Sequence, residues 1–239
     1  MSSRFDRLDA LRGVAIVWMA GFHLCFDLNL YGLMPAQNFY RDPFWLNQRT
    51  CIVTLFIFCA GLGQAVAMSG GGQGWPRFWR RWAQVAGCAV LVSAGSALMF
   101  PKTWISFGVL HGIAVMLIIT RLAAPPGRWL WVLGVAAIAL PALWRSPFFD
   151  APWMQWLGLG TRKPFTEDYV PVLPWLGVMF LGLAAGRWLL QHRRAAFTGP
   201  VPPLLRHLAW LGRHSLSFYM LHQPVLLGLL MGGRMLGAW

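Results

Sequence analysis

Short polar loops divide this chain into a series of long apolar runs, and these runs limit the fold more than any other feature. Of the 239 residues, 57% are hydrophobic and only 11% are charged, which is too apolar for an ordinary soluble domain. An apolar run of about 20 residues crosses the hydrocarbon core of a bilayer as a helix. The sequence therefore predicts an all-α, polytopic membrane helix bundle of about seven transmembrane helices, forming a single integral membrane domain over residues 1–239.

Loops that contain proline, glycine and polar residues mark the ends of the apolar runs. The seven expected spans are Gly13–Met34, Thr50–Met68, Trp82–Phe100, Trp104–Ala123, Arg128–Trp144, Pro171–Leu190 and Leu208–Met231. Between the fifth and sixth spans, the apolar piece Ala151–Gly160 is too short to cross. We expect this piece to be re-entrant or interfacial.

Basic residues are distributed unevenly between the two sides of the predicted bundle. With the N-terminus in the cytoplasm, 13 of the 20 Lys and Arg residues fall on the inner side, as the positive-inside rule requires. The arginines lie in short loops rather than on one soluble face, so nucleic acid is not an expected partner despite the net charge of +13. We therefore expect the lipid bilayer as the surroundings, with the N-terminus cytoplasmic and the C-terminus outside.

The first apolar run contains a histidine and an aspartate at membrane depth. His23 and Asp27 lie one helical turn apart on one face, and Arg12 lies on the same face about 16 Å away. Ionisable groups in lipid are costly and usually face a protein interior or a watery cavity. A carboxylate at i+4 can hold an imidazole tautomer and stabilise its protonated form, so His23 with Asp27 predicts a general-base site. The alternatives are a helix-packing role for His23 and a snorkelling role for Arg12.

Three further residues are candidates for function. His111 lies in the fourth span between two glycines, which allow a close approach of helices. His222 is followed by a Gln-Pro pair, which breaks the backbone locally, and Asp168 lies at the outer entry of the sixth span. Each also has a structural alternative: packing for His111, a hydrogen-bonded structural role for His222 and a solvated loop carboxylate for Asp168. No metal-ligand spacing and no nucleotide-binding glycine motif occurs, so no metal is expected.

Several segments, found in the same order and covering nearly the whole chain, resemble one family. They are RLDALRGVAIVWMAGFHLCFDLNLYG, FIFCAGLG, GVLHGIAV, DYVPVLPWLGVMFLGLAAGR and LGRHSLSFYMLHQPVLLGLL. They resemble the short bacterial membrane proteins grouped as DUF1624, which are related to the catalytic domain of heparan-alpha-glucosaminide N-acetyltransferase. More distantly, the spacing of Arg12 and His23 resembles an arginine–histidine spacing in membrane acyltransferase-3 type proteins.

The resemblance implies an acyltransferase of the bacterial inner membrane. It would take an acyl group, with acetyl as the expected group, from cytoplasmic acetyl-CoA or another acyl-CoA. The acceptor would be an amino or hydroxyl group of a sugar or glycan at the outer side. Acyl-CoA would be a co-substrate, with no permanently bound cofactor. The expected catalytic residues are His23 and Asp27, the expected CoA-binding residues are Arg12, Arg80, Arg81 and His111, and the expected acceptor-binding residues are Asp168 and His222.

One departure from the family pattern leaves alternatives open. The lysosomal enzyme has its active-site histidine in the loop after the first helix of the domain, and the corresponding loop here, Pro35–Asn47, contains no histidine. Either His23 carries the activity, as in the O-acyltransferase relatives, or the acceptor chemistry differs. A competing class is a non-enzymatic transporter or flippase component in which His23 and Asp27 relay protons. The sequence sets neither the acceptor nor the choice between a monomer and a homodimer.

Overall fold

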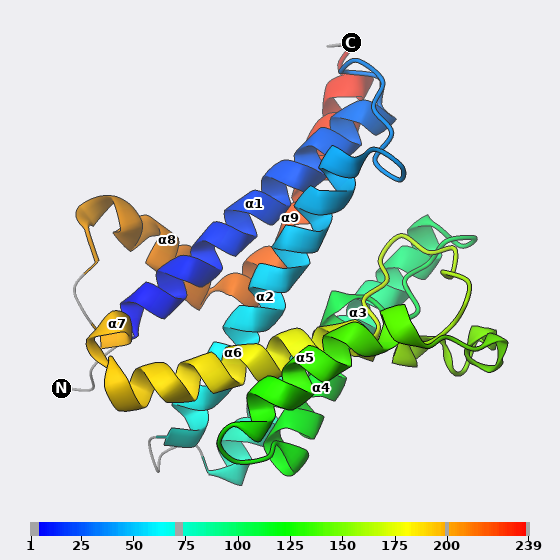
Figure 1. The fold of residues 1–239 in the computed structure, drawn as a ribbon. Helices are drawn as coiled ribbons and strands as arrows, with labels where there is room; N and C mark the ends of the chain where they lie inside the picture. Colours follow the sequence, from blue (N-terminus) through cyan, green and yellow to red (C-terminus); the bar gives the residue numbers. More distant parts are fainter. Residues whose placement is uncertain (1–4, 70–73, 199–200, 238–239) are drawn as a thin grey trace. The chain divides into compact units, whose positions relative to one another are not determined.

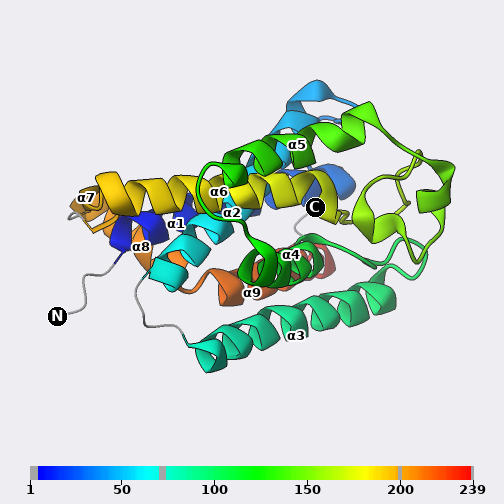
Figure 2. The same ribbon diagram turned by 60° about the horizontal axis from the view of Figure 1, so that its bottom comes forward.

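The computed structural model describes residues 5–69, 74–198 and 201–237. Regular structure in these ranges is helical, apart from one isolated parallel bridge between Phe107 and Tyr169, which confirms the all-α class. The chain divides into two compact units, Met1–Phe56 with Phe197–Trp239 and Ile57–Ala196. Figure 1 and Figure 2 show the helices of both units. The expected single domain over residues 1–239 stays a prediction, because two such units can belong to one domain.

The first unit is organised around helix α1 (Asp6–Leu30). This helix packs against α8 (Pro203–Arg213) and α9 (Ser215–Met235), as Figure 1 shows. The unit also holds the first part of α2 (Pro43–Ser69), and the boundary between the two units falls within the short α7 (Ala195–Thr198).

Glycines bring α1 and α8 into backbone contact. A Cβ atom on Gly13 would overlap the carbonyl group of Leu208, and one on Gly212 would overlap the carbonyl group of Asp9. Small residues at helix interfaces allow such an approach in membrane proteins. The first half of α1 is therefore held firmly against α8.

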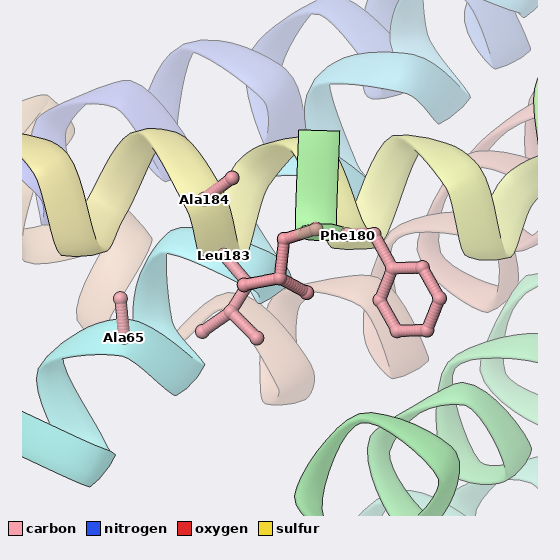
Figure 3. Close-up of a cluster of buried hydrophobic side chains, with 5 residues drawn as sticks. Ala65, Phe180, Leu183 and Ala184 are labelled. Atoms are coloured by element: carbon pink, nitrogen blue, oxygen red, sulfur yellow. The ribbon is translucent and has the colours of Figure 1, made fainter. Parts of the chain in front are cut away.

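The second unit contains the rest of α2, four further helices and two 3₁₀ turns. Their bounds are α3 (Trp75–Met99), α4 (Val109–Ala123), α5 (Trp129–Leu143), η1 (Pro147–Asp150), η2 (Gln155–Leu157) and α6 (Val172–His192). Helix α6 packs against α5 and α4, and α4 packs against α3 (Figure 2). Figure 3 shows the buried cluster around α6, in which one residue of α2 and one of α5 meet three residues of α6: Ala65, Leu130, Phe180, Leu183 and Ala184.

Five helices in the described ranges are long and apolar enough to cross a membrane, namely α1, α2, α3, α6 and α9. The expected fourth and fifth spans correspond to α4 and α5, which have 15 residues each. At 1.5 Å per residue such a helix is about 22 Å long, which is shorter than the hydrocarbon core of about 30 Å. The expected number of about seven transmembrane helices is therefore not confirmed.

The expected seventh span, Leu208–Met231, is wrong at its beginning. The structure divides this stretch between α8, which ends at Arg213, and α9, which begins at Ser215. Hydropathy joins the apolar residues on both sides, but α8 is amphipathic and exposes Arg206, so it does not continue the apolar run. The span is reduced to α9.

The excursion between α5 and α6 is folded back on itself by polar contacts. Both oxygens of the Asp150 carboxylate accept hydrogen bonds from Thr161, and one also accepts from the backbone of Arg162. These bonds lower the pKa of Asp150, with the Thr161 hydroxyl as the largest cause. Tyr169 donates to the carbonyl of Gln155, and burial raises the pKa of Tyr169 to about 12. The re-entrant or interfacial placement of Ala151–Gly160 stays a prediction.

Candidate functional site

Four polar side chains of the first unit meet between α1 and α9. His23 and Asp27 come from α1, and His222 and Gln223 come from α9. The ring centroids of His23 and His222 are 5.1 Å apart, with 58° between the ring planes. The Nε2 atom of Gln223 lies 3.0 Å from each carboxylate oxygen of Asp27. These four residues are called the α1–α9 polar cluster below.

The hydrogen bond of His222 assigns its tautomer. Nδ1 of His222 lies 2.7 Å from the carbonyl oxygen of Tyr219. Because a carbonyl oxygen can only accept, Nδ1 carries the proton and Nε2 keeps a free lone pair. The Nε2 atom is buried and has no hydrogen-bond partner within the described ranges. Leaving a buried acceptor unpaired costs free energy. A hydrogen-bond donor that reaches this atom would remove that cost.

His23 is the polar neighbour that faces this histidine. No hydrogen bond or ion pair joins His23 to another described residue. Its ring lies edge-on to the ring of Phe22, with centroids 5.8 Å apart, and beside the ring of His222. Both ring nitrogens of His23 therefore keep their capacity for a substrate or for His222.

Asp27 has a different partner from the one that sequence reasoning gives it. The residue is 1% exposed, and its carboxylate accepts from Gln223. No hydrogen bond joins Asp27 to His23 in the part of the chain that the structure describes. The physical reason is that Gln223 brings a directed N–H donor from α9, while the imidazole of His23 lies against His222. The carboxylate thus joins α9 to α1 next to the histidine pair.

Gln223 is the member of the cluster that sequence reasoning missed. Pro224 follows it inside α9, and proline has no N–H for the carbonyl of Met220. The Gln-Pro pair that singles out His222 in the sequence applies equally to Gln223, and α9 continues through Pro224. An uncharged glutamine in an apolar helix attracts less notice than a histidine.

Arg12 belongs to the first unit, and the two arginines of α3 belong to the second. Nη1 of Arg12 lies 3.1 Å from Oδ1 of Asp9, and the two side chains are 31% and 15% exposed. A pair this exposed contributes little to stability. Arg80 and Arg81 are exposed residues of α3 in the second unit, and they are not part of the α1–α9 polar cluster.

His111 links α3 to α4 within the second unit. Its Nδ1 accepts from the backbone N–H of Gly108 at 3.3 Å, and its Nε2 lies 3.1 Å from Oγ of Ser93. The Ser93 hydroxyl donates to the carbonyl of Ile105 at 2.6 Å, so it accepts from the Nε2–H of His111. One ring nitrogen thus caps the start of its own helix α4, and the other joins α4 to α3. The expected role of His111 in CoA binding stays a prediction.

Asp168 caps the N-terminus of α4. Its Oδ2 accepts a hydrogen bond from the backbone N–H of Val109 at 2.7 Å. At this position a carboxylate satisfies an unpaired helix donor and interacts favourably with the positive end of the helix dipole. A Cβ atom on Gly108 would overlap this carboxylate, so glycine makes room for it. Asp168 therefore has a structural partner, and its expected role in acceptor binding stays a prediction.

Replacing Asp168 by alanine should lower the stability of the second unit by about 0.5–2 kcal/mol, because α4 loses its cap. Asp168→Asn keeps an acceptor oxygen and should lose less. The midpoint of thermal unfolding in detergent measures both changes. An unchanged midpoint for Asp168→Ala would contradict the capping role.

The structure thus brings His23, Asp27 and His222 together in one unit, and it places His111 and Asp168 around the start of α4 in the other. Among the residues described, no group of three His, Cys, Asp or Glu side chains is arranged to hold a metal ion. The chemistry that the α1–α9 polar cluster offers is proton transfer by imidazole in a low-dielectric setting.

Comparison with protein families gives a match that covers most of the chain. Residues 4–224 match the model of the family described as heparan-alpha-glucosaminide N-acetyltransferase, catalytic. The matched range ends at Pro224, so it contains the whole α1–α9 polar cluster. Comparisons with curated proteins and with solved structures give no significant match. The family match confirms the resemblance to the heparan-alpha-glucosaminide N-acetyltransferase catalytic domain, and it indicates a membrane-embedded transferase.

Proposed function

Because the chain belongs to the family of heparan-alpha-glucosaminide N-acetyltransferase catalytic domains, we propose that it is an acyl-CoA-dependent acyltransferase. It takes an acyl group, with acetyl as the expected group, from cytoplasmic acyl-CoA. It transfers this group to an amino or hydroxyl group of a glycan-type acceptor at the outer side. The observation that carries the proposal is the His23–His222 pair, with the unpartnered Nε2 of His222, between two helices apolar enough to cross a membrane. Ionisable groups at such depth mark functional sites.

The proposed reaction needs one base. The acceptor nitrogen or oxygen attacks the thioester carbonyl, so that a C–N or C–O bond forms and the C–S bond to CoA breaks. His23 takes the proton of the acceptor as general base. That proton then passes to the departing thiolate, and CoA leaves as the free thiol. In a second version His23 attacks first, releases CoA and carries the acyl group to the acceptor.

His222 takes the orienting role that sequence reasoning gave to Asp27. A ring N–H of His23 can donate a hydrogen bond to the unpaired Nε2 of His222. The other ring nitrogen of His23 then remains free to act as the base. Asp27 acts one step further away, because its contact with Gln223 fixes the turn of α9 that carries His222. His23 is the catalytic residue of the proposal, and His222 and Asp27 are positioning residues.

On the donor side, Arg12 would contact the CoA phosphates, since a guanidinium fork matches phosphate oxygens. Arg80 and Arg81 are further donor-side candidates on α3. Asp168 is the acceptor-side candidate of the second unit, although its Oδ2 already caps α4.

We also propose an inner-membrane location with the N-terminus cytoplasmic, because 13 of the 20 basic residues fall on the inner side of the seven-span arrangement expected from the sequence. The loop residues 70–73 and the terminal residues 238–239 lie outside the described ranges, so exposed neighbours serve as probes. In a background without the four native cysteines, a cysteine at Leu236 should react with an impermeant maleimide in intact cells. A cysteine at Gly74 should react only after permeabilisation. The reverse pattern would contradict the orientation.

Titration with a thioether analogue of acetyl-CoA distinguishes an acyltransferase from the competing class, a transporter or flippase component. An acyltransferase must form a saturable complex with this analogue in detergent. A transporter or flippase component with a His23–Asp27 proton relay would instead give proton-coupled flux in vesicles without CoA. Such flux, together with no saturable binding of the analogue, would overturn the proposal.

A further inference from the structure

Two arginines of α8 line a cavity beside the first turns of α1, and the proposed reaction has not used them. The cavity has a volume of about 300 Å³ and is lined by Asp6, Val201, Arg206, Ala209 and Arg213. All five residues belong to the first unit. With two guanidinium groups and one carboxylate, the lining carries a net positive charge.

Most guanidinium donors of these two arginines are unused within the described ranges. Arg206 forms no hydrogen bond or ion pair with another described residue, and Arg213 donates only from Nε, to the carbonyl of Ala209 at 3.1 Å. A guanidinium group carries five N–H donors in a planar fork that fits the oxygens of a phosphate. A cavity with surplus donors and net positive charge suits a phosphate or pyrophosphate group.

The backbone contact between α1 and α8 fixes where these donors lie. A Cβ atom on Gly212 would overlap the carbonyl of Asp9, so the next residue, Arg213, lies beside the second turn of α1. From Asp9 to His23 the helix rises by about 21 Å. The cavity and the α1–α9 polar cluster are therefore two positions along one continuous helix, with Arg12 between them.

We propose that this cavity binds the phosphate groups of acyl-CoA, so that Arg206 and Arg213 join Arg12 on the donor side. The inference rests on the proposed acyl transfer. A ligand that has phosphates at one end, a thioester at the other and a long arm between them matches a cationic cavity and a general base separated along α1. The headgroup of an anionic lipid offers the same phosphate chemistry, since α8 is amphipathic and exposes Trp210, and the experiment must distinguish the two.

Adenosine 3′,5′-bisphosphate is a suitable probe, because it carries ribose phosphates without the arm or the thioester. Its affinity for the purified full-length protein in neutral detergent should fall about tenfold for each of Arg206→Gln and Arg213→Gln, since each removes charge-assisted hydrogen bonds. Arg206→Lys should keep part of the affinity, because the charge stays but the fork is lost. Arg234→Gln is the matched control, an exposed arginine at the far end of α9 that should bind the probe as the wild type does.

Unchanged affinity for the bisphosphate in a variant that combines Arg206→Gln with Arg213→Gln would overturn the proposal. Loss of binding to phosphatidylglycerol nanodiscs with full retention of the bisphosphate would also overturn it, because the cavity would then hold a lipid headgroup. Arg206→Gln removes no hydrogen bond or ion pair to a described residue, so its unfolding midpoint should equal that of the wild type. If the bisphosphate binds as expected while acetyl transfer is absent, the phosphate site stands and the proposed function fails.

Discussion

Replacement of His23 by alanine is expected to abolish acyl transfer while acyl-CoA still binds. The change removes the group that takes the acceptor proton, and general-base assistance contributes about 10²–10⁴-fold to a rate. The cavity with Arg206 and Arg213 lies about 20 Å away along α1, so the donor end of the site is unaffected. Turnover and affinity for the thioether analogue, measured on the same detergent preparation, check both halves of this result.

His207→Ala is the matched control for His23→Ala. His207 is an exposed histidine of α8 in the same unit and is outside the α1–α9 polar cluster, so its loss should leave turnover unchanged. His111 is the rival base. Wild-type turnover in His23→Ala together with lost turnover in His111→Ala would show that the mechanism is wrong.

Replacement of His222 by alanine is expected to lower turnover by about 10²-fold with little change in the affinity for acyl-CoA. The change removes the unpaired Nε2 acceptor beside His23, so the proposed hydrogen bond that selects the tautomer of the His23 ring can no longer form. His222→Gln supplies a carbonyl acceptor and should recover part of kcat. A purely packing role for His222 would instead change the unfolding midpoint and give no such recovery.

The two histidines are expected to act as one unit. His23→Ala combined with His222→Ala should be little worse than His23→Ala alone, because the orienting residue has nothing left to orient. Asp27→Asn should slow transfer by a smaller factor, since Asp27 acts through Gln223. Multiplicative losses in the double variant would show that the histidines act separately, which would contradict the proposed roles.

The helical membrane class of the protein and the place of His23 within an apolar helix could be predicted from the sequence, because each depends on local information. Hydropathy identifies a membrane helix without knowledge of its neighbours, and an ionisable side chain inside an apolar run is conspicuous. The partner of Asp27 could not be predicted in this way. Gln223 lies 196 residues further along the chain, and its contact depends on the register of α9 against α1, which no periodicity within α1 contains.

Three other features depend on packing in the same way. The α8–α9 break at His214 is hidden from hydropathy, because apolar residues lie on both sides of it. Arg206 and Arg213 look like topogenic arginines until Gly212 is seen to hold α8 against α1. Asp168 and His111 look like free polar groups until the N-terminus of α4 lies beside them.

The most direct test of the central claim is acetyl transfer by the purified protein in proteoliposomes. Acetyl-CoA with a labelled acetyl group is supplied on the side of the Gly74 loop, and a panel of amino sugars and neutral sugars is supplied on the other side. We expect the wild type to form a labelled acetyl-sugar and free CoA thiol in equal amounts, and His23→Ala to form no acetyl-sugar. Release of CoA without an acetylated sugar, or equal product from His23→Ala, would contradict the central claim.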